Sequence, residues 1–156
     1  MRTILTRLMM GLAITALAAL AADNTIGTWK LNMAQSKFTP GPGPVKSLTV
    51  TREASDGGIK VTVTGERADG TPADSSYTAK YDGQEVKVAG NAPYDTVSVK
   101  QVDANTLTDE RTKTGTQYRA SGRIVISNGG KTMTVTIKGT DAGGKAFTYV
   151  VMYEKQ

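Results

Sequence analysis

The sequence predicts an all-β domain folded as a single up-and-down antiparallel barrel of about ten strands. Composition is the first reason, because residues 22–156 hold 20 Thr, 13 Val and 16 Gly but only 3 Leu, a balance typical of strands and turns rather than helices. The second reason is that short runs alternate apolar and polar residues. The third is that Asp-Gly and Asn-Gly turn sequences separate these runs at close intervals. A chain of 156 residues is long enough for one such domain with a buried core.

Residues 1–21 have the pattern of a secretory signal peptide. Arg2 and Arg7 give it a positive start, and an apolar run follows from Leu8 to Leu20. That run is shorter than the roughly 20 residues of a membrane span, and it ends in an Ala-x-Ala cleavage pattern. We therefore expect a mature domain of residues 22–156 that is periplasmic or secreted, with no membrane span after cleavage.

Ten strands are expected in the mature domain. In the run from Ile59 to Val63, apolar residues alternate with Lys and Thr, and the run from Thr132 to Ile137 does the same. Period-two alternation with one apolar side indicates half-buried antiparallel strands. Nearly every link has hairpin length, so neighbours in sequence should pair. The expected strands are residues 26–31, 46–53, 59–66, 75–81, 85–89, 95–102, 106–113, 117–127, 131–139 and 145–155.

One long irregular stretch is expected, from Asn32 to Val45. Its centre, residues 39–44, reads Thr-Pro-Gly-Pro-Gly-Pro, which continues neither a helix nor a strand ladder. This segment is either a surface loop or a functional flap over an opening. The alternative architecture, a two-sheet β-sandwich, needs several long crossing connections. Since only this link is long, we favour a barrel, which also removes exposed strand edges.

Composition and motifs exclude most reaction chemistry. The chain has no Cys and no His, which excludes disulfides, Cys/His zinc sites and Ser-His-Asp triads. No phosphate loop or nucleophile elbow occurs, and the carboxylates lie mostly in turns or on outward positions. The formal charge falls from +5 to +3 without the two leader arginines and is thinly spread, which is unlike a nucleic-acid-binding protein. We expect no enzyme, no cofactor, no metal and no nucleic-acid partner.

The apolar side of each strand is assigned to the barrel interior. Five of these inward residues are tyrosines, whose hydroxyls need partners when buried and which could line a ligand site. They could equally lie near the rims with hydrated hydroxyls. The inward set is Ile59, Val61, Val63, Tyr77, Ala79, Tyr81, Val86, Val88, Val97, Val99, Leu107, Tyr118, Ala120, Ile124, Ile126, Met133, Val135, Ile137, Phe147, Tyr149, Val151 and Tyr153.

Two charged residues share the inward face of the strand at residues 106–113. Leu107, Asp109 and Arg111 alternate along it, so an inward Leu107 places the two charges inside. Buried charges must be paired and hydrogen-bonded, so the two could bind each other or anchor a ligand, with Arg111 the donor. A bulge or a strand end at the wet rim would instead turn them to solvent. Arg119 and Arg123 fall on the outward side.

Both ends of the mature chain carry a family resemblance. Gly27-Thr28-Trp29-Lys30-Leu31 resembles the opening strand of the lipocalin and fatty-acid-binding-protein barrels, the calycins, and Met152-Tyr153-Glu154-Lys155-Gln156 is similar to the closing strand of intracellular fatty-acid-binding proteins. The mature sequence is also similar to small exported bacterial lipocalin-like proteins of unassigned function. The resemblance implies a barrel with an interior cavity for a small apolar ligand and with the Trp29 indole across one end.

The sequence departs from fatty-acid-binding proteins at two places. Those proteins insert a helical lid after the first strand, whereas residues 32–45 are short and rich in Pro and Gly. They also place an Arg two residues before the closing Tyr, where this chain has Val151 before Tyr153. We expect a non-enzymatic barrel whose ligand-binding residues are Tyr77, Tyr81, Asp109, Arg111, Tyr118, Tyr149 and Tyr153. The alternative is a solid-cored envelope or interaction module, or an inhibitor, that binds a protein partner through residues 39–44 and 90–94.

Overall fold

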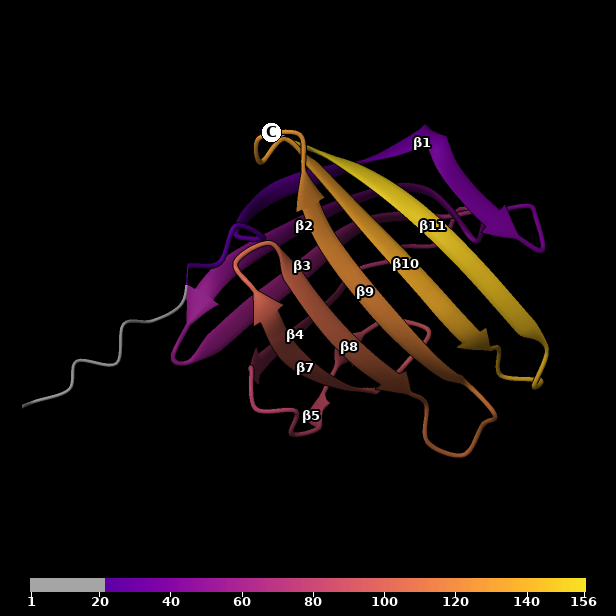
Figure 1. The fold of residues 1–156 in the computed structure, drawn as a ribbon. Helices are drawn as coiled ribbons and strands as arrows, with labels where there is room; N and C mark the ends of the chain where they lie inside the picture. Colours follow the sequence, from indigo (N-terminus) through magenta and orange to yellow (C-terminus); the bar gives the residue numbers. More distant parts are fainter. Residues whose placement is uncertain (1–21) are drawn as a thin grey trace, which may run out of the picture.

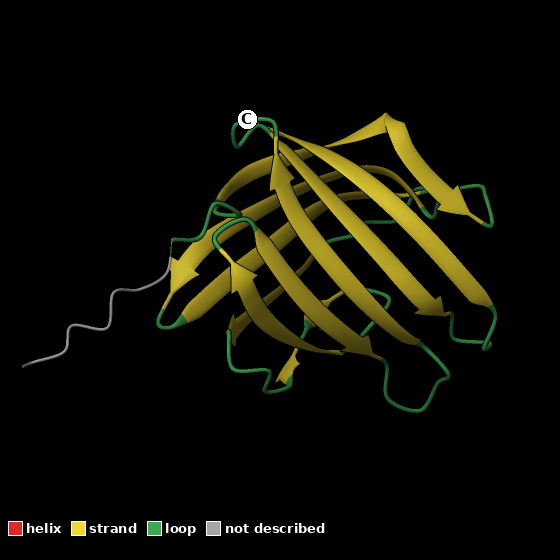
Figure 2. Ribbon diagram, viewed as in Figure 1, coloured by secondary structure: helices red, strands yellow, loops and turns green. Residues whose placement is uncertain are grey.

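A computed structural model describes residues 22–156, and these residues form one all-β structure without a helix (Figure 2). The signal peptide predicted for residues 1–21 lies outside the described residues. No described segment is a helix long and apolar enough to span a membrane. The strands are β1 (Gly27–Thr39), β2 (Val45–Ser55), β3 (Gly58–Arg67), β4 (Ser75–Lys80), β5 (Val86–Lys87), β6 (Ala89–Gly90), β7 (Thr96–Asp103), β8 (Thr106–Thr112), β9 (Arg119–Ser127), β10 (Thr132–Thr140) and β11 (Ala146–Lys155).

All eleven strands belong to a single antiparallel sheet in the order β5-β7-β8-β9-β10-β11-β1-β2-β3-β4-β6. The first and last long strands pair, with Trp29 opposite Lys155 and Leu31 opposite Tyr153. The sheet therefore curls round until β4 comes near β7 (Figure 1). This is the up-and-down barrel predicted from the sequence, nearly closed, and it is not the alternative sandwich.

The first strand is longer than predicted. Residues 32–39, expected to be irregular, continue β1, and the irregular link shrinks to residues 40–44. The pairing of β1 with β11 shifts register between Asn32 and Lys37. Ser36 stabilises this bulge, since its hydroxyl donates to the Asn32 carbonyl and accepts from the Met152 N–H. The bulge breaks the alternation of apolar residues, which is why the sequence pattern did not reveal the strand.

The strand predicted at residues 85–89 is two short strands instead. β5 pairs with β7, whereas β6 pairs with β4. The chain passes here from β7 at one edge of the sheet to β4 at the other. Because it changes partner on the way, each of the two pairings is only two residues long. These two short pairings lie where the barrel is nearly closed.

The interior assignment is confirmed. Each residue of the predicted inward set is either buried in a core cluster or packs against one. Trp29 is fully buried near the start of β1, and its indole N–H donates to the Thr25 carbonyl at 2.8 Å. Residues 22–26 lie across this end and are joined to the β7–β8 turn by a 2.8 Å bond from the Asn24 N–H to the Ala104 carbonyl. We call it the closed end.

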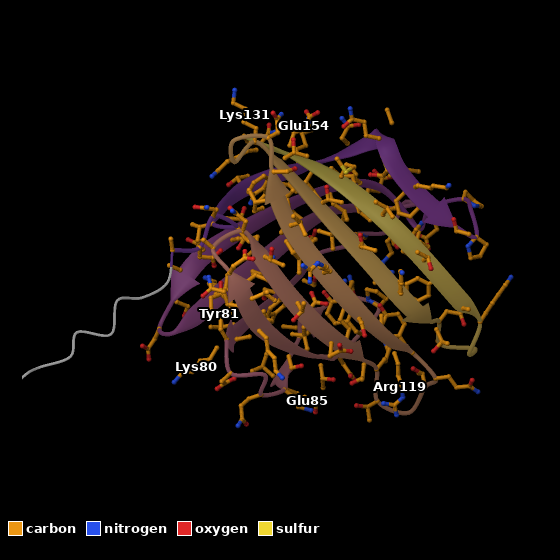
Figure 3. All side chains as sticks on the ribbon, viewed as in Figure 1. Lys80, Tyr81, Glu85, Arg119, Lys131 and Glu154 are labelled. Carbon is orange, nitrogen blue, oxygen red and sulfur yellow. The ribbon has the colours of Figure 1, made fainter. Side chains whose placement is uncertain are left out.

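The opposite end of the barrel carries the longer loops. The links after β1, β3, β6, β8 and β10 all gather there, because successive strands run antiparallel. In Figure 1 the β1–β2 and β10–β11 links lie on the right, at the opposite end of the barrel from the β2–β3 turn. Figure 3 shows Arg119 at this end, and it is exposed, as expected. We call it the loop end.

Candidate functional site

The barrel encloses a cavity of about 530 Å³. Its walls are mostly apolar side chains from the inward faces of β2, β3, β9, β10 and β11, and it extends to the loop end, where Phe38, Pro44, Pro93 and Ala142 border it. Ligand-binding cavities in proteins usually have volumes of about 300–1,000 Å³. The solid core expected under the alternative hypothesis is therefore not what the structure has.

Asp109 and Arg111 face this cavity from β8. Arg111 donates twice to the Asp109 carboxylate, from Nε to Oδ1 at 2.8 Å and from Nη2 to Oδ2 at 2.7 Å. The side chains are 2% and 14% exposed respectively. The pairing of β8 with β9 runs in register through both residues, so neither a bulge nor a strand end turns them to solvent.

Gly122 makes room for the Asp109 carboxylate. It lies directly opposite Asp109 on β9, and a Cβ atom built there would come within 2.2 Å of Asp109 Oδ1. In the inward series of β9, this glycine stands between Ala120 and Ile124. The missing side chain at Gly122 thus leaves the space that the Asp109 carboxylate occupies in the ion pair.

The surroundings keep the Arg111 guanidinium charged. Burial by itself would lower the pKa of Arg111, but the neighbouring Asp109 carboxylate raises it, and the pKa ends well above its usual value. The guanidinium carbon also lies 5.1 Å from the ring centre of Tyr94, within the range of a cation–π contact. The pair is therefore a fixed polar feature in an otherwise apolar wall.

Four of the five predicted tyrosines line the cavity: Tyr77, Tyr118, Tyr149 and Tyr153. Burial raises the pKa of Tyr118 and of Tyr153 to about 12 and raises the pKa of Tyr77 and Tyr149. All four therefore remain neutral hydroxyls near pH 7, able both to donate and to accept a hydrogen bond.

Tyr81 does not line the cavity. Its hydroxyl donates to the Asp23 carboxylate at the closed end. Burial, followed by the hydrogen bond to Asp23, raises the pKa of Tyr81. The structure thus separates this tyrosine from the other six predicted site residues, which it brings together.

A run of five aromatic rings forms one wall near the loop end. The ring centres of successive members lie between 4.6 and 6.2 Å apart, which suits the offset and edge contacts that aromatic rings prefer. The order is Phe38, Tyr149, Phe147, Tyr118 and Tyr94. Tyr94 and Phe38 are absent from the predicted site, because one lies in a loop and the other in the stretch expected to be irregular.

Arg52 on β2 is a cavity residue that is absent from the predicted site. It is 5% exposed, and its Nε donates to the Thr25 hydroxyl at 3.3 Å. The signal was present, because Leu48, Val50 and Arg52 alternate just as Leu107, Asp109 and Arg111 do. Among the described residues, no group of three or more His, Cys, Asp or Glu side chains is placed to hold a metal ion.

Comparison with known proteins gives a likeness of fold. No family model matches the chain, and no curated protein matches its sequence. Among solved structures, the Schistosoma mansoni fatty acid binding protein in complex with arachidonic acid is similar, with a TM-score of 0.60 and 16% identity. The match covers 87% of this chain and 98% of that one. The chain therefore has the calycin barrel fold that its two ends suggested.

Proposed function

We propose that this protein is an exported, non-enzymatic barrel that binds a small, mostly apolar molecule in its interior. The observation that carries the proposal is the cavity of about 530 Å³ with apolar walls and a few inward polar groups. A site of that size and composition buries most of the surface of a small ligand and orients it through its few polar contacts. The similar structure contains a fatty acid, which supports the apolar class of ligand.

The Asp109–Arg111 pair and the cavity tyrosines would hold the polar part of such a ligand. A guanidinium has five N–H donors, and the pair uses two of them, one on Nε and one on Nη2 of Arg111. The rest, together with the hydroxyls of Tyr118 and Tyr153, can donate to a ligand oxygen. Because Val151 replaces the arginine of fatty-acid-binding proteins, this chain would use a polar set of its own.

A neutral fluorescent probe tests the proposal. N-phenyl-1-naphthylamine should bind the mature chain and fluoresce in the apolar interior. Ile137→Trp fills part of the cavity, because Ile137 lines it, and should weaken probe binding at least about tenfold, the effect of losing about 1.4 kcal/mol. Thr136→Trp places the same ring on the outer face of β10 and should bind like the parent chain. Absent binding, or equal binding by both variants, would contradict the proposal.

Export is the part of the proposal that rests on residues 1–21 alone. Their signal-peptide pattern predicts a mature chain that begins near Ala22. Intact-mass measurement of protein recovered from a bacterial periplasm or culture medium checks this. A chain still carrying Met1 in those fractions would contradict cleavage.

A further inference from the structure

Arg52 is a buried charge in the cavity wall that forms no direct ion pair with a described residue. Arg52 is 5% exposed, and arginine side chains are almost never so buried unless they are paired. Within residues 22–156 the ion pairs are Lys46–Glu66 and Asp109–Arg111, so no described carboxylate oxygen lies within 4.0 Å of the Arg52 guanidinium. Its Nε donates to the Thr25 hydroxyl at 3.3 Å, and that hydroxyl donates in turn to the Asp23 carboxylate at 2.6 Å. A described carboxylate is therefore linked to Arg52 only through Thr25.

The terminal nitrogens of Arg52 make no hydrogen bond to a described residue, unlike its Nε. Every fully enclosed polar side-chain atom among the described residues has a hydrogen-bond partner. The Nη atoms, which have none, therefore border open space. Arg52 lines the cavity, which brings its guanidinium within reach of an anion bound there.

The two interior arginines therefore differ in what they can bind. Asp109 takes up the charge of Arg111 through two direct hydrogen bonds, whereas Arg52 has no direct carboxylate partner among the described residues and reaches Asp23 only through the Thr25 hydroxyl. A buried charge without a partner is costly, and an anionic ligand group would remove that cost. A ligand anion is thus expected to prefer Arg52 to Arg111.

Arg52 lies at the bottom of the cavity. On β2 it lies opposite Gly27 of β1, and Gly27 is two residues before Trp29, which fills the closed end. The aromatic wall from Phe38 to Tyr94 lies toward the loop end. An amphiphile bound with its anion at Arg52 would lay its apolar body along the cavity toward these rings.

We propose, building on the proposed function, that the ligand is an anionic amphiphile whose carboxylate, sulfonate or phosphate binds the Arg52 guanidinium at the closed end. The charged group enters first and the apolar body fills the cavity behind it. Arg111, neutralised by Asp109, contributes polar contacts along the wall and is not the anion site.

A matched pair of probes tests this. 8-Anilinonaphthalene-1-sulfonate and N-phenyl-1-naphthylamine share one ring system and differ by the sulfonate. Arg52→Gln should weaken binding of the sulfonate probe at least about tenfold, as expected for loss of a charge-assisted hydrogen bond. The neutral probe should change less than about threefold. Arg123→Gln removes the same charge from the outer face of β9, where Arg123 is exposed, and should change neither affinity.

The outcomes separate this inference from the proposed function. If the neutral probe fails to bind the parent chain, the cavity is not a binding site. If it binds, but Arg52→Gln and Arg123→Gln affect the sulfonate probe equally, the Arg52 site is wrong. Arg52→Lys keeps the charge and should restore at least part of the sulfonate affinity.

A measurement on the parent chain covers the case in which Arg52→Gln does not fold. Decanoate and decylammonium, compared at pH 7.5, have the same alkyl chain and opposite charges. Decanoate should displace the bound neutral probe at a concentration at least about tenfold lower. Equal displacement, or preferred displacement by decylammonium, would overturn the proposal.

Discussion

At the scale of single residues, the interior depends on how each buried polar group is matched. Asp109 is accepted because Arg111 holds both carboxylate oxygens and because Gly122 leaves space beside it. Arg52 forms no direct ion pair with a residue in the described part of the chain, and the Thr25 hydroxyl links it to the Asp23 carboxylate. The alternation rule predicts that all three face inward, but it cannot tell which charge finds a partner, because that depends on neighbouring strands in the folded barrel.

Single and double substitutions of the β8 pair should behave very differently. Asp109→Val or Arg111→Tyr alone leaves the other charge buried and unpaired, and should lower the free energy of unfolding by about 3–5 kcal/mol. The double variant removes both charges and restores an apolar face, so its stability should approach that of the parent. Urea-unfolding midpoints of the three variants measure this. Single changes costing less than about 1 kcal/mol would show that the pair behaves as an exposed one.

The tyrosines give the fold a defined sensitivity to alkali. Burial raises the pKa of all six above the ordinary value of 10.0. Above pH 10 the unfolded chain loses tyrosine protons that the folded chain keeps, so stability should be full below pH 10 and fall as the pH rises toward 12. Absorbance at 295 nm should show little ionisation at pH 10 while circular dichroism remains native. Half-complete ionisation of all six at pH 10, in the folded chain, would contradict this.

At the scale of elements, the end of β1 and the loop that follows it form part of the border of the cavity at the loop end. We call this border the mouth of the cavity. Phe38 makes an edge contact with Tyr149, with ring centres 5.1 Å apart. It also lies so close to Gly43 that a Cβ there would come within 2.6 Å of the ring. The Pro-Gly sequence of residues 40–44 thus lets the loop pack flat against Phe38.

Shortening the Phe38 side chain should widen this mouth. Phe38→Ala is expected to speed both association and dissociation of N-phenyl-1-naphthylamine severalfold, with a smaller change in affinity, because the ring lies at the border of the cavity. Stopped-flow fluorescence measures both rates. Met33→Ala is a matched control on the same strand, since Met33 is 40% exposed. Unchanged rates in Phe38→Ala would mean that the probe enters elsewhere.

Most strands could be predicted from period-two alternation and turn residues, and the misses have physical causes. Residues 32–36 of β1 carry a bulge held by Ser36 hydrogen bonds, which no alternation pattern reveals. β5 and β6 follow from the way the sheet ends meet, which is a property of the closed barrel. Tyr94 joins the site from a loop, so no strand register could have placed it.

At the scale of the whole molecule, the chain is a cysteine-free barrel held by its ladders and its core. Trp29 and residues 22–26 fill one end, and the longer loops border the other. Between them the side chains leave about 530 Å³ unfilled. That volume could not be predicted from the sequence, because it depends on how inward side chains from opposite walls meet across the barrel. Its three buried charged groups, Arg52, Asp109 and Arg111, were partly predictable, since each lies on an inward strand position.

Methyl NMR during a titration with N-phenyl-1-naphthylamine tests the central claim most directly, that ligand occupies the barrel interior. Val151 lines the cavity, whereas its neighbour Val150 points outward on the same strand and Val102 is 56% exposed. The ring current of the bound probe should shift the Val151 methyl resonances strongly and those of Val150 and Val102 little. Shifts confined to Val150, Val102 and other outer methyls, with Val151 unchanged, would contradict interior binding.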